Sequence, residues 1–181
     1  LGLAQTGSGK TAAYLIPLMV HVINQPEIKE GDGPIGLICT PTRELCQQVY
    51  IEAKVFAKAY NLTVTAVYGG ANKHAQELLL KSGTEILVAT PGRLIDMIKT
   101  GVTNLSRVTF LVFDEADHMF DLGFGTQVRS ISRNIRPDRQ CLLFSATLKK
   151  DIDNLCLDIL TDPIRVEIGE IGQVFYPFQH F

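Results

Sequence analysis

The chain has 181 residues, of which 46% are hydrophobic and 20% are charged, and it carries a net charge of −2. This length suits one domain with a single core, and the composition is typical of a globular protein. The slightly acidic balance excludes a protein that grips nucleic acid through bulk positive charge, and the longest apolar runs are too short to span a membrane.

Short apolar runs rich in β-branched and aromatic residues predict strands, and stretches of helical period separate them. Because such strands alternate with helices, we expect an α/β fold, a mostly parallel sheet with helices on both faces. In one stretch the apolar residues recur every three or four positions, as in an amphipathic helix: Leu45, Val49, Ala53, Phe56 and Tyr60. The predicted strands are 1–4, 35–40, 63–68, 86–90, 108–114, 141–145 and 164–168, and residues 25–34 predict a loop.

The first predicted strand leads into AQTGSGKT, residues 4–11, and then into a helix, as in a P-loop. Glycines let successive N–H groups converge on phosphate oxygens, the Lys adds charge at the β and γ phosphates, and the Thr offers a hydroxyl to Mg²⁺. The alternative is a Gly-rich turn that caps a helix. The predicted nucleotide-binding residues are Ala4, where the general pattern has Gly, and Gln5, Thr6, Gly7, Ser8, Gly9, Lys10 and Thr11.

Two later segments, CTPTREL and ATPGRLI, are built alike, because each ends a strand with Thr-Pro-x-Arg and continues into an apolar helix. We expect Thr40 and Thr90 to cap these helices and Pro41 and Pro91 to occupy their first positions. Each helix would then offer free N–H groups and its positive end to a phosphate.

Each segment places an arginine in the first turn of its helix, where a positive charge is unfavourable for the helix dipole. A role in which the arginine faces phosphate would explain this position. The alternative interpretation is an ordinary capped helix with a solvated Arg. Two glycines after the strand at 63–68 would let a backbone approach closely, although a plain turn also accounts for them. These features predict sequence-independent contacts to a nucleic-acid backbone. The predicted residues are Pro41, Thr42, Arg43, Glu44, Gly69, Gly70, Thr90, Pro91, Gly92 and Arg93.

The segment LVFDEADHMF, residues 111–120, crowds Asp114, Glu115 and Asp117 directly after an apolar strand. Like charges this close repel one another, so a positive partner is expected. Together with the P-loop, Asp114 would hold Mg²⁺ opposite Thr11, and Glu115 would orient or deprotonate the attacking water. The alternative is an acidic turn at the surface.

Ser145 is the last residue of the predicted strand at 141–145, and Ala146 and Thr147 follow it. From the residues alone this is a strand-end turn in which Thr147 caps the following helix, and its hydroxyl is also free to bond Asp117. His118 is interpreted as a solvated turn residue.

The four cysteines form no metal-binding or CxxC spacing, and most of them lie in apolar stretches, where they are expected to be small core residues: Cys39, Cys46, Cys141 and Cys156. Such cysteines favour a reducing compartment, cytosol or nucleus.

Residues 1–168 resemble the first RecA-like domain of a DEAD-box RNA helicase. The family signature stands intact at 114–117, and AQTGSGKT, PTREL, GG, TPGR and SAT match its other first-domain motifs in order. The resemblance implies a RecA-like P-loop domain that uses ATP and Mg²⁺ to unwind RNA duplexes or remodel RNA–protein particles. It makes Asp117 and the Ser145-Ala146-Thr147 turn the coupling between hydrolysis and strand separation.

The resemblance is strongest to a nuclear, splicing-associated subgroup, so the expected location is the nucleus, with the cytoplasm as the alternative. Expected partners are RNA, a second RecA-like domain of the same protein and spliceosomal or other RNP proteins, with no membrane and a monomeric fragment. The alternatives to unwinding are an ATP-gated RNA clamp or assembly platform, and an unrelated P-loop ATPase that acts on protein or DNA.

In this family a Gln motif upstream of the P-loop reads the adenine, and the second domain supplies an arginine finger. We expect both to lie outside this chain, so that the fragment binds ATP weakly and hydrolyses it negligibly. The tail 169–181 is aromatic where the family has a polar interdomain linker. A truncated or artefactual end and a docking peptide are the two interpretations of this tail.

Overall fold

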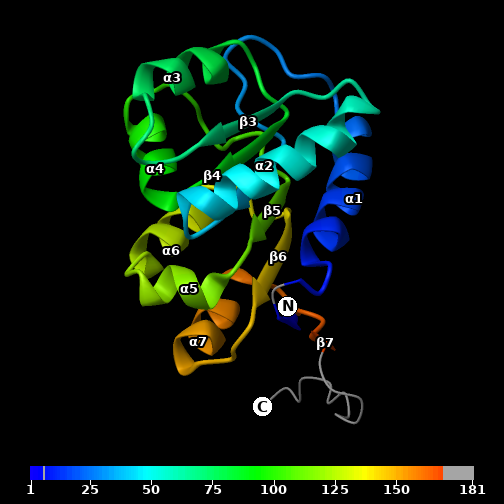
Figure 1. Cartoon of the computed structure of the whole chain (residues 1–181), viewed down its shortest axis with the longest axis vertical. Helices are drawn as coiled ribbons and strands as arrows, with labels where there is room; N and C mark the ends of the chain where they lie inside the picture. Colours follow the sequence, from blue (N-terminus) through cyan, green and yellow to red (C-terminus); the bar gives the residue numbers. More distant parts are fainter. Residues whose placement is uncertain (6, 169–181) are drawn as a thin grey trace.

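The computed structural model describes residues 1–5 and 7–168, so the predictions for Thr6 and for the tail 169–181 lie outside the described residues. Strands and helices alternate along the chain (Figure 1). The strands are β1 (Gly2–Ala4), β2 (Gly36–Cys39), β3 (Val64–Val67), β4 (Ile86–Ala89), β5 (Phe110–Phe113), β6 (Gln140–Ser145) and β7 (Val166–Ile168). The helices are α1 (Lys10–Ile23), α2 (Arg43–Lys58), α3 (Lys73–Lys81), α4 (Pro91–Lys99), α5 (Ala116–Asp121), α6 (Gly125–Arg133) and α7 (Lys150–Ile159).

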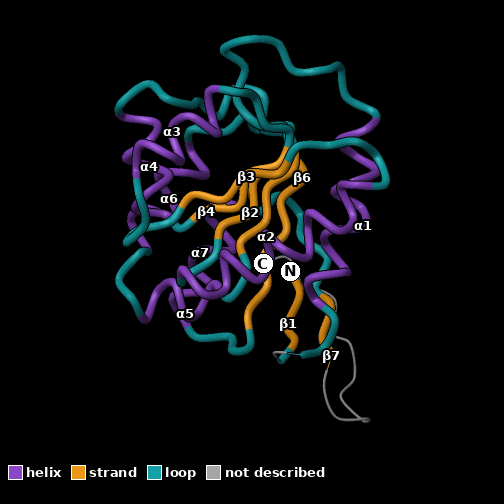
Figure 2. Tube along the Cα trace, turned by 45° about the horizontal axis from the view of Figure 1, so that its top comes forward, coloured by secondary structure: helices purple, strands orange, loops and turns teal. Residues whose placement is uncertain are grey.

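The strands form one sheet in the order β3-β4-β2-β5-β6-β1-β7, and every described pair of neighbours is parallel. Figure 2 shows β3, β4 and β2 side by side, with β1 and β7 at the other end of the sheet. Each predicted strand is confirmed, with both of its ends within two residues of the prediction. The carboxyl ends of parallel strands share one edge of the sheet, which is where ligands bind in such folds.

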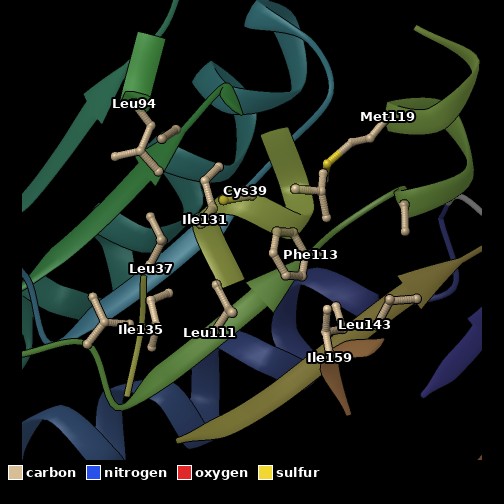
Figure 3. Packing of buried hydrophobic residues seen from close by; sticks show 14 of the residues in the cluster. Leu37, Cys39, Leu94, Leu111, Phe113, Met119, Ile131, Ile135, Leu143 and Ile159 are labelled. Atoms are coloured by element: carbon tan, nitrogen blue, oxygen red, sulfur yellow. The ribbon is translucent and has the colours of Figure 1, made fainter. Parts of the chain in front are cut away.

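Helices cover both faces of the sheet, as predicted. Alternate residues of a strand point to opposite faces, so Leu111 and Phe113 pack in one core cluster and Phe110 and Val112 in the other. The first cluster, shown in part in Figure 3, includes residues of α4, α5, α6 and α7, whereas the second includes residues of α1 and α2. The sheet edge at the carboxyl ends of the strands is therefore supported by a hydrophobic core on each face of the sheet.

The start of α2 corrects one sequence-based prediction. The helix begins at Arg43, and Thr42 caps it by accepting a hydrogen bond at 3.2 Å from the main-chain N–H of Leu45. Thr40 and Pro41 are therefore not the cap and the first helical residue, because the Thr42 hydroxyl already satisfies the free N–H group at that helix end. At the other end of the predicted helix, Tyr60 lies just beyond α2.

The predicted start of α4 is correct in position, whereas the predicted start of α7 is wrong. Thr90 is the N-cap position of α4 and Pro91 its first residue, as predicted, but the Thr90 side chain makes no capping hydrogen bond. Helix α7 begins at Lys150 with Lys149 at the N-cap position, so the prediction that Thr147 caps this helix is wrong. The physical reason is that the Thr147 hydroxyl donates to the side chain of Asp117 instead.

The remaining predictions about the fold concern cysteines, the first long loop and membrane spans. All four cysteines are free, three are buried, and burial raises the pKa of their thiols, as expected of core residues. Residues 25–34 contain no helix or strand, and Arg107 holds this loop through an ion pair to Asp32 at 2.6 Å. Among the described helices, none combines the length and the apolar character that a membrane crossing requires.

Candidate active site

The loop between β1 and α1 has the backbone of a phosphate-binding turn. Gly7 and Gly9 have φ angles of 83° and 85°, in the left-handed region that glycine adopts most readily. Ser8 closes the turn, because its N–H and its hydroxyl both donate to the carbonyl of Gln5, at 3.3 and 2.7 Å. Helix α1 begins directly after Gly9 without a side-chain cap, so its first N–H groups are available to an anion.

Two charged groups are buried beside this loop with unsatisfied atoms. Lys10 is 8% exposed and Asp114 is 3% exposed. Among the residues that the structure describes, Lys10 Nζ and Asp114 Oδ1 have no hydrogen-bond partner. Buried polar atoms without partners are rare in folded proteins, so each such atom calls for an explanation. A ligand that offers oxygens to Lys10 and a cation to Asp114 satisfies both.

The hydroxyl of Tyr14 connects the two residues that were predicted to hold Mg²⁺. It donates a hydrogen bond to Asp114 Oδ2 at 3.0 Å, and the side chain of Thr11 interacts with the same hydroxyl. Thr11 and Asp114 therefore both act on the Tyr14 hydroxyl, and their joint binding of Mg²⁺ stays a prediction. Tyr14 lies one turn after Lys10 on the buried side of α1, and sequence analysis missed it because a buried aromatic residue there looks like ordinary core.

Burial dominates the electrostatics of Asp114. It raises the pKa of this carboxyl, while the hydrogen bond from Tyr14 and the charge of Lys10 oppose the rise and the charge of Glu115 adds to it. Burial also raises the pKa of the Tyr14 phenol, with the charge of Asp114 as the next cause, so the phenol remains a hydrogen-bond donor. The carboxylate is thus held in an unfavourable environment, which a bound cation would relieve.

These residues fit a nucleotide with its Mg²⁺. Mg²⁺ is commonly bound by one or two carboxylates together with substrate phosphates, and Asp114 supplies a carboxylate oxygen that is otherwise unpaired. A cavity of about 940 Å³ adjoins the loop, with Ser8, Gly9 and Lys10 at one part of its wall and apolar residues such as Leu3 and Ile168 at another. A polar part beside an apolar part suits a phosphate chain joined to a nucleoside.

Glu115 stands at a strained position two residues after the end of β5. Its φ and ψ angles are 52° and 53°, a left-handed conformation that few residues other than glycine adopt, and such strain is frequent at functional sites. Its Oε2 lies 3.3 Å from Nδ1 of His118, three residues later on α5. His118 is therefore not simply a solvated turn residue, and its spacing from Glu115 was the signal that could have shown the contact.

Asp117 joins α5 to the turn after β6. Its Oδ2 accepts hydrogen bonds from the N–H and the hydroxyl of Thr147, at 3.0 and 2.8 Å, and its Oδ1 accepts one from the N–H of His118 at 3.1 Å. Burial alone would raise the pKa of Asp117, but the bonds from Thr147 and His118 outweigh it and lower the pKa. Ser145 completes the turn by donating to the carbonyl of Thr147 at 2.7 Å. The predicted contact between Asp117 and Thr147 is confirmed.

Both arginines of the twin segments bind the loop between β3 and α3. Arg43 donates to the carbonyl of Gly70 at 3.3 Å and lies over the ring of Tyr68, 5.4 Å from its centroid. Arg93 reaches the carbonyl of Ala71 with both terminal nitrogens, each at 3.4 Å. The two arginines are therefore not free in solvent, because each donates a hydrogen bond to a carbonyl of this loop.

A buried glutamine, which sequence analysis missed, fixes the same loop from below. Gln76 of α3 is 6% exposed, and its side-chain amide bonds both the N–H and the carbonyl of Tyr68, each at 3.2 Å. Its Oε1 also accepts a hydrogen bond from Arg93 at 3.0 Å. Together with the left-handed Gly70, at φ 76°, these bonds shape the loop after β3, and the parallel pairing of β3, β4 and β2 places their ends in one surface. This surface contains the residues that were predicted to contact a nucleic-acid backbone.

Comparisons with known proteins agree with this geometry. The model of the family described as "DEAD/DEAH box helicase" matches residues 1–155. The chain is 59% identical over 172 residues to "DEAD-box ATP-dependent RNA helicase 24" of Arabidopsis thaliana, covering 95% of this chain and 23% of that protein. It is also 59% identical over 173 residues to "ATP-dependent RNA helicase DDX42" of Homo sapiens, covering 96% of this chain and 18% of that protein.

Solved structures resemble the fold closely. The yeast DEAD-box splicing factor Prp28 matches with a TM-score of 0.86 and 36% identity, over 96% of this chain and 42% of that chain. A hypothetical ATP-dependent RNA helicase from Sulfolobus tokodaii matches with a TM-score of 0.80 and 36% identity, over 92% of this chain and 47% of that chain. The chain spans about a fifth of the length of the curated relatives described above. With its RecA-like fold and its family match, the chain belongs to the DEAD/DEAH box helicase family.

Proposed function

We propose that this chain, over residues 1–168, is the ATP-binding half of an ATP-dependent RNA helicase. The observation that carries the proposal is the pair of unsatisfied buried atoms, Lys10 Nζ and Asp114 Oδ1, beside a phosphate-binding turn. Family membership and relatives named as ATP-dependent RNA helicases support the same activity.

The residues of the turn divide the work of binding. The main chain from Ala4 to Gly9, with the start of α1, cradles the phosphates, and Lys10 neutralises the β and γ phosphates. Thr11 and Asp114 hold Mg²⁺, which supplies positive charge to the phosphate oxygens when it is bound. Glu115 orients the attacking water or accepts its proton, since its carboxylate directly follows the metal-binding residue.

The contact between Asp117 and Thr147 couples the nucleotide site to RNA. Asp117 is three residues from Asp114, so a shift of this segment on hydrolysis reaches the end of β6 through two hydrogen bonds. Ser145 and Ala146 shape the turn that receives the shift. A short contact of this kind transmits movement because packed segments change position together.

RNA lies across the ends of β2, β3 and β4 and is held by its backbone. The starts of α2 and α4 offer N–H groups to the phosphates of the RNA. The small residues Gly69 and Gly70 let the RNA backbone approach the loop closely. Arg43 and Arg93 set the shape of that loop as well as its charge. The contacting residues are Pro41, Thr42, Arg43, Glu44, Gly69, Gly70, Thr90, Pro91, Gly92 and Arg93.

The whole protein has a second RecA-like domain, which supplies an arginine finger and closes over ATP and RNA. Spliceosomal or other RNP proteins are its partners and the nucleus is its location, an inference supported by the structural likeness to a splicing factor.

Substitution of Glu115 in the full-length protein tests the function. The Glu115→Gln variant should keep ATP-dependent binding to RNA and lose RNA-stimulated ATP hydrolysis and strand separation, whereas Lys10→Ala should lose ATP binding itself. Glu30→Gln, in an exposed loop, is the matched control and should behave as wild type. If the wild-type protein grips RNA with ATP but separates no duplex, it is an ATP-gated clamp. If DNA competes as well as RNA, the RNA assignment fails.

A further inference from the structure

We propose that Tyr14 is a positioning residue that orients the Asp114 carboxylate and thereby sets the affinity of the nucleotide site for Mg²⁺. This inference rests on the proposed function, because it takes Asp114 as the carboxylate that holds the metal. The role follows from contacts in the interior of this chain.

The geometry divides the two oxygens of Asp114 between two tasks. Tyr14 donates to Oδ2 at 3.0 Å, and Oδ1 is buried with no hydrogen-bond partner within residues 1–5 and 7–168. A carboxylate with one oxygen fixed cannot rotate freely about its Cβ–Cγ bond, so the other oxygen keeps one direction. The hydrogen bond thus reserves Oδ1 for a cation, in the way that outer partners orient metal ligands.

The position of Tyr14 suits this role. It is fully buried on α1, one turn after Lys10, so that its hydroxyl lies on the same side of the helix as the P-loop lysine. Asp114 accepts a hydrogen bond from this hydroxyl, and Thr11 lowers its pKa, so both residues proposed to hold the metal act on this one group. Displacement of the hydroxyl would therefore disturb both of them.

Packing alone does not explain the hydroxyl. The Tyr14 ring lies 5.5 Å from the ring of Phe144, at an interplanar angle of 51°, within an apolar cluster where a phenylalanine would fit as well. Burying a hydroxyl in such a cluster is unfavourable unless it forms a hydrogen bond. Its observed bond goes to Asp114, so the carboxylate is the feature that accounts for a tyrosine here.

A tyrosine with a purely structural role would have different consequences. Loss of a structural hydrogen bond lowers the stability of the fold and leaves the metal dependence of nucleotide binding unchanged. Loss of a positioning bond weakens metal binding selectively, commonly by about 10- to 100-fold when an outer partner of a metal ligand is removed. Metal affinity therefore separates the two interpretations, whereas loss of activity would not.

The test uses the full-length protein and the variant Tyr14→Phe, which removes one oxygen and keeps the ring. Binding of a fluorescent ADP analogue is titrated in EDTA and again over a range of Mg²⁺ concentrations, and Mn²⁺ binding is followed by electron paramagnetic resonance. We expect unchanged affinity for the analogue in EDTA and an increase of about 10-fold or more in the Mg²⁺ concentration that gives half of the metal-dependent gain.

Matched variants separate the possible failures. Tyr60→Phe makes the same chemical change at an exposed site and should behave as wild type, whereas Asp114→Asn should abolish the metal-dependent gain. In the Asp114→Asn background, Tyr14→Phe should cause no further loss of metal response. Equal weakening with and without metal, or wild-type metal affinity of Tyr14→Phe, overturns the role of Tyr14. If the wild type itself shows no metal-dependent binding, or if Asp114→Asn retains it, the proposed function fails instead.

Discussion

Thr147 donates two hydrogen bonds to a single carboxylate oxygen of Asp117, from its main-chain N–H at 3.0 Å and from its hydroxyl at 2.8 Å. The two residues are 30 positions apart, so the pair is a tertiary contact between α5 and the turn after β6. It connects the acidic segment to the turn after β6. A small change at this contact should therefore affect both stability and coupling.

We predict that Thr147→Val separates ATP hydrolysis from unwinding. Valine keeps the shape of threonine and the main-chain N–H bond to Asp117, but it has no hydroxyl to donate the second bond. Hydrogen bonds to charged groups contribute about 1.5 kcal/mol or more to stability. The free energy of unfolding from urea titrations should fall by about that amount. In the full-length protein, duplex unwinding should fall more than RNA-stimulated ATP hydrolysis.

Thr126→Val is the matched control, because Thr126 is exposed near the start of α6 and should tolerate the change. Equal loss of hydrolysis and unwinding in Thr147→Val would contradict a coupling role and indicate a general defect.

The lowered pKa of Asp117 predicts sensitivity to acid. Its ordinary pKa is 3.8, and burial would raise it, but the bonds from Thr147 and His118 lower it in the folded chain. A carboxyl with a lowered folded pKa contributes stability above its unfolded pKa and loses that contribution as the pH falls through the folded value. In Asp117→Asn the stability should therefore depend less on pH below 3.8 than in wild type.

Urea midpoints measured from neutral pH down to about pH 3 would show the difference as a shallower acid limb of the Asp117→Asn curve. Asp153→Asn, at an exposed position of α7, is the control and should follow the wild-type curve. Parallel acid limbs for wild type and Asp117→Asn would refute the prediction.

Asp114 has the opposite sign. Because burial raises its pKa, the folded chain binds a proton at Asp114 more readily than the unfolded chain does, and ionisation at neutral pH costs stability. Asp114→Asn removes this cost and keeps an oxygen that accepts from Tyr14. In EDTA at neutral pH the melting temperature of the chain should rise by about 2 to 4 °C, which corresponds to about 1 kcal/mol in a domain of this length.

Calorimetry in EDTA measures this shift, and repeating it with Mg²⁺ and ADP should reverse the ranking, because only the wild type gains stability from the metal. A lower melting temperature for Asp114→Asn in EDTA would show that its charge, through Lys10, stabilises the free chain after all.

Arg93 should be needed for RNA binding through the loop that it holds. Lysine keeps the positive charge but cannot bond the Ala71 carbonyl with two nitrogens and Gln76 at the same time, so the loop should lose its fixed shape. We expect Arg93→Lys in the full-length protein to weaken RNA binding by about 5- to 10-fold, the equivalent of about 1 kcal/mol. Fluorescence anisotropy with labelled RNA measures this loss.

Arg133→Lys, at an exposed end of α6, is the matched control. ATP affinity should be unchanged in both variants. Wild-type RNA affinity in Arg93→Lys would mean that charge alone, rather than the shape of the loop, is what the RNA senses.

The strands and the P-loop could be predicted from the sequence because their signals are local. Apolar runs such as FLVF define a doubly covered strand over a few residues, and the glycines with the lysine define the phosphate turn. The helix starts were harder, since CTPTREL offers more than one threonine as a cap. Only the packed structure shows that Thr42, and not Thr40, reaches the free N–H of Leu45.

The contacts that complete the site depend on long-range packing and leave no local pattern. Tyr14 and Asp114 are 100 positions apart, and Arg93 and Ala71 are 22 apart. A tyrosine on the buried face of a helix is usually a core residue, and an arginine in a first turn is usually solvated. Their partners become visible only when the sheet brings the strand ends together.

The isolated chain should bind ATP weakly and hydrolyse it negligibly. Among the described residues, Lys10 is the cation whose charge acts on Asp114. Arg43 and Arg93 are instead hydrogen-bonded to the loop after β3. In related phosphoryl-transfer enzymes, an arginine finger that stabilises the transition state raises turnover by about 10³- to 10⁵-fold. Since the relatives are about four to five times as long as this chain, we expect that arginine to come from another part of the whole protein. A steady-state ATPase assay of residues 1–181 with saturating RNA, beside the full-length protein and its Glu115→Gln variant as the background, measures the difference. Turnover by residues 1–181 comparable to that of the full-length protein would show that the site needs no second domain, and it would remove the physical reason for proposing one.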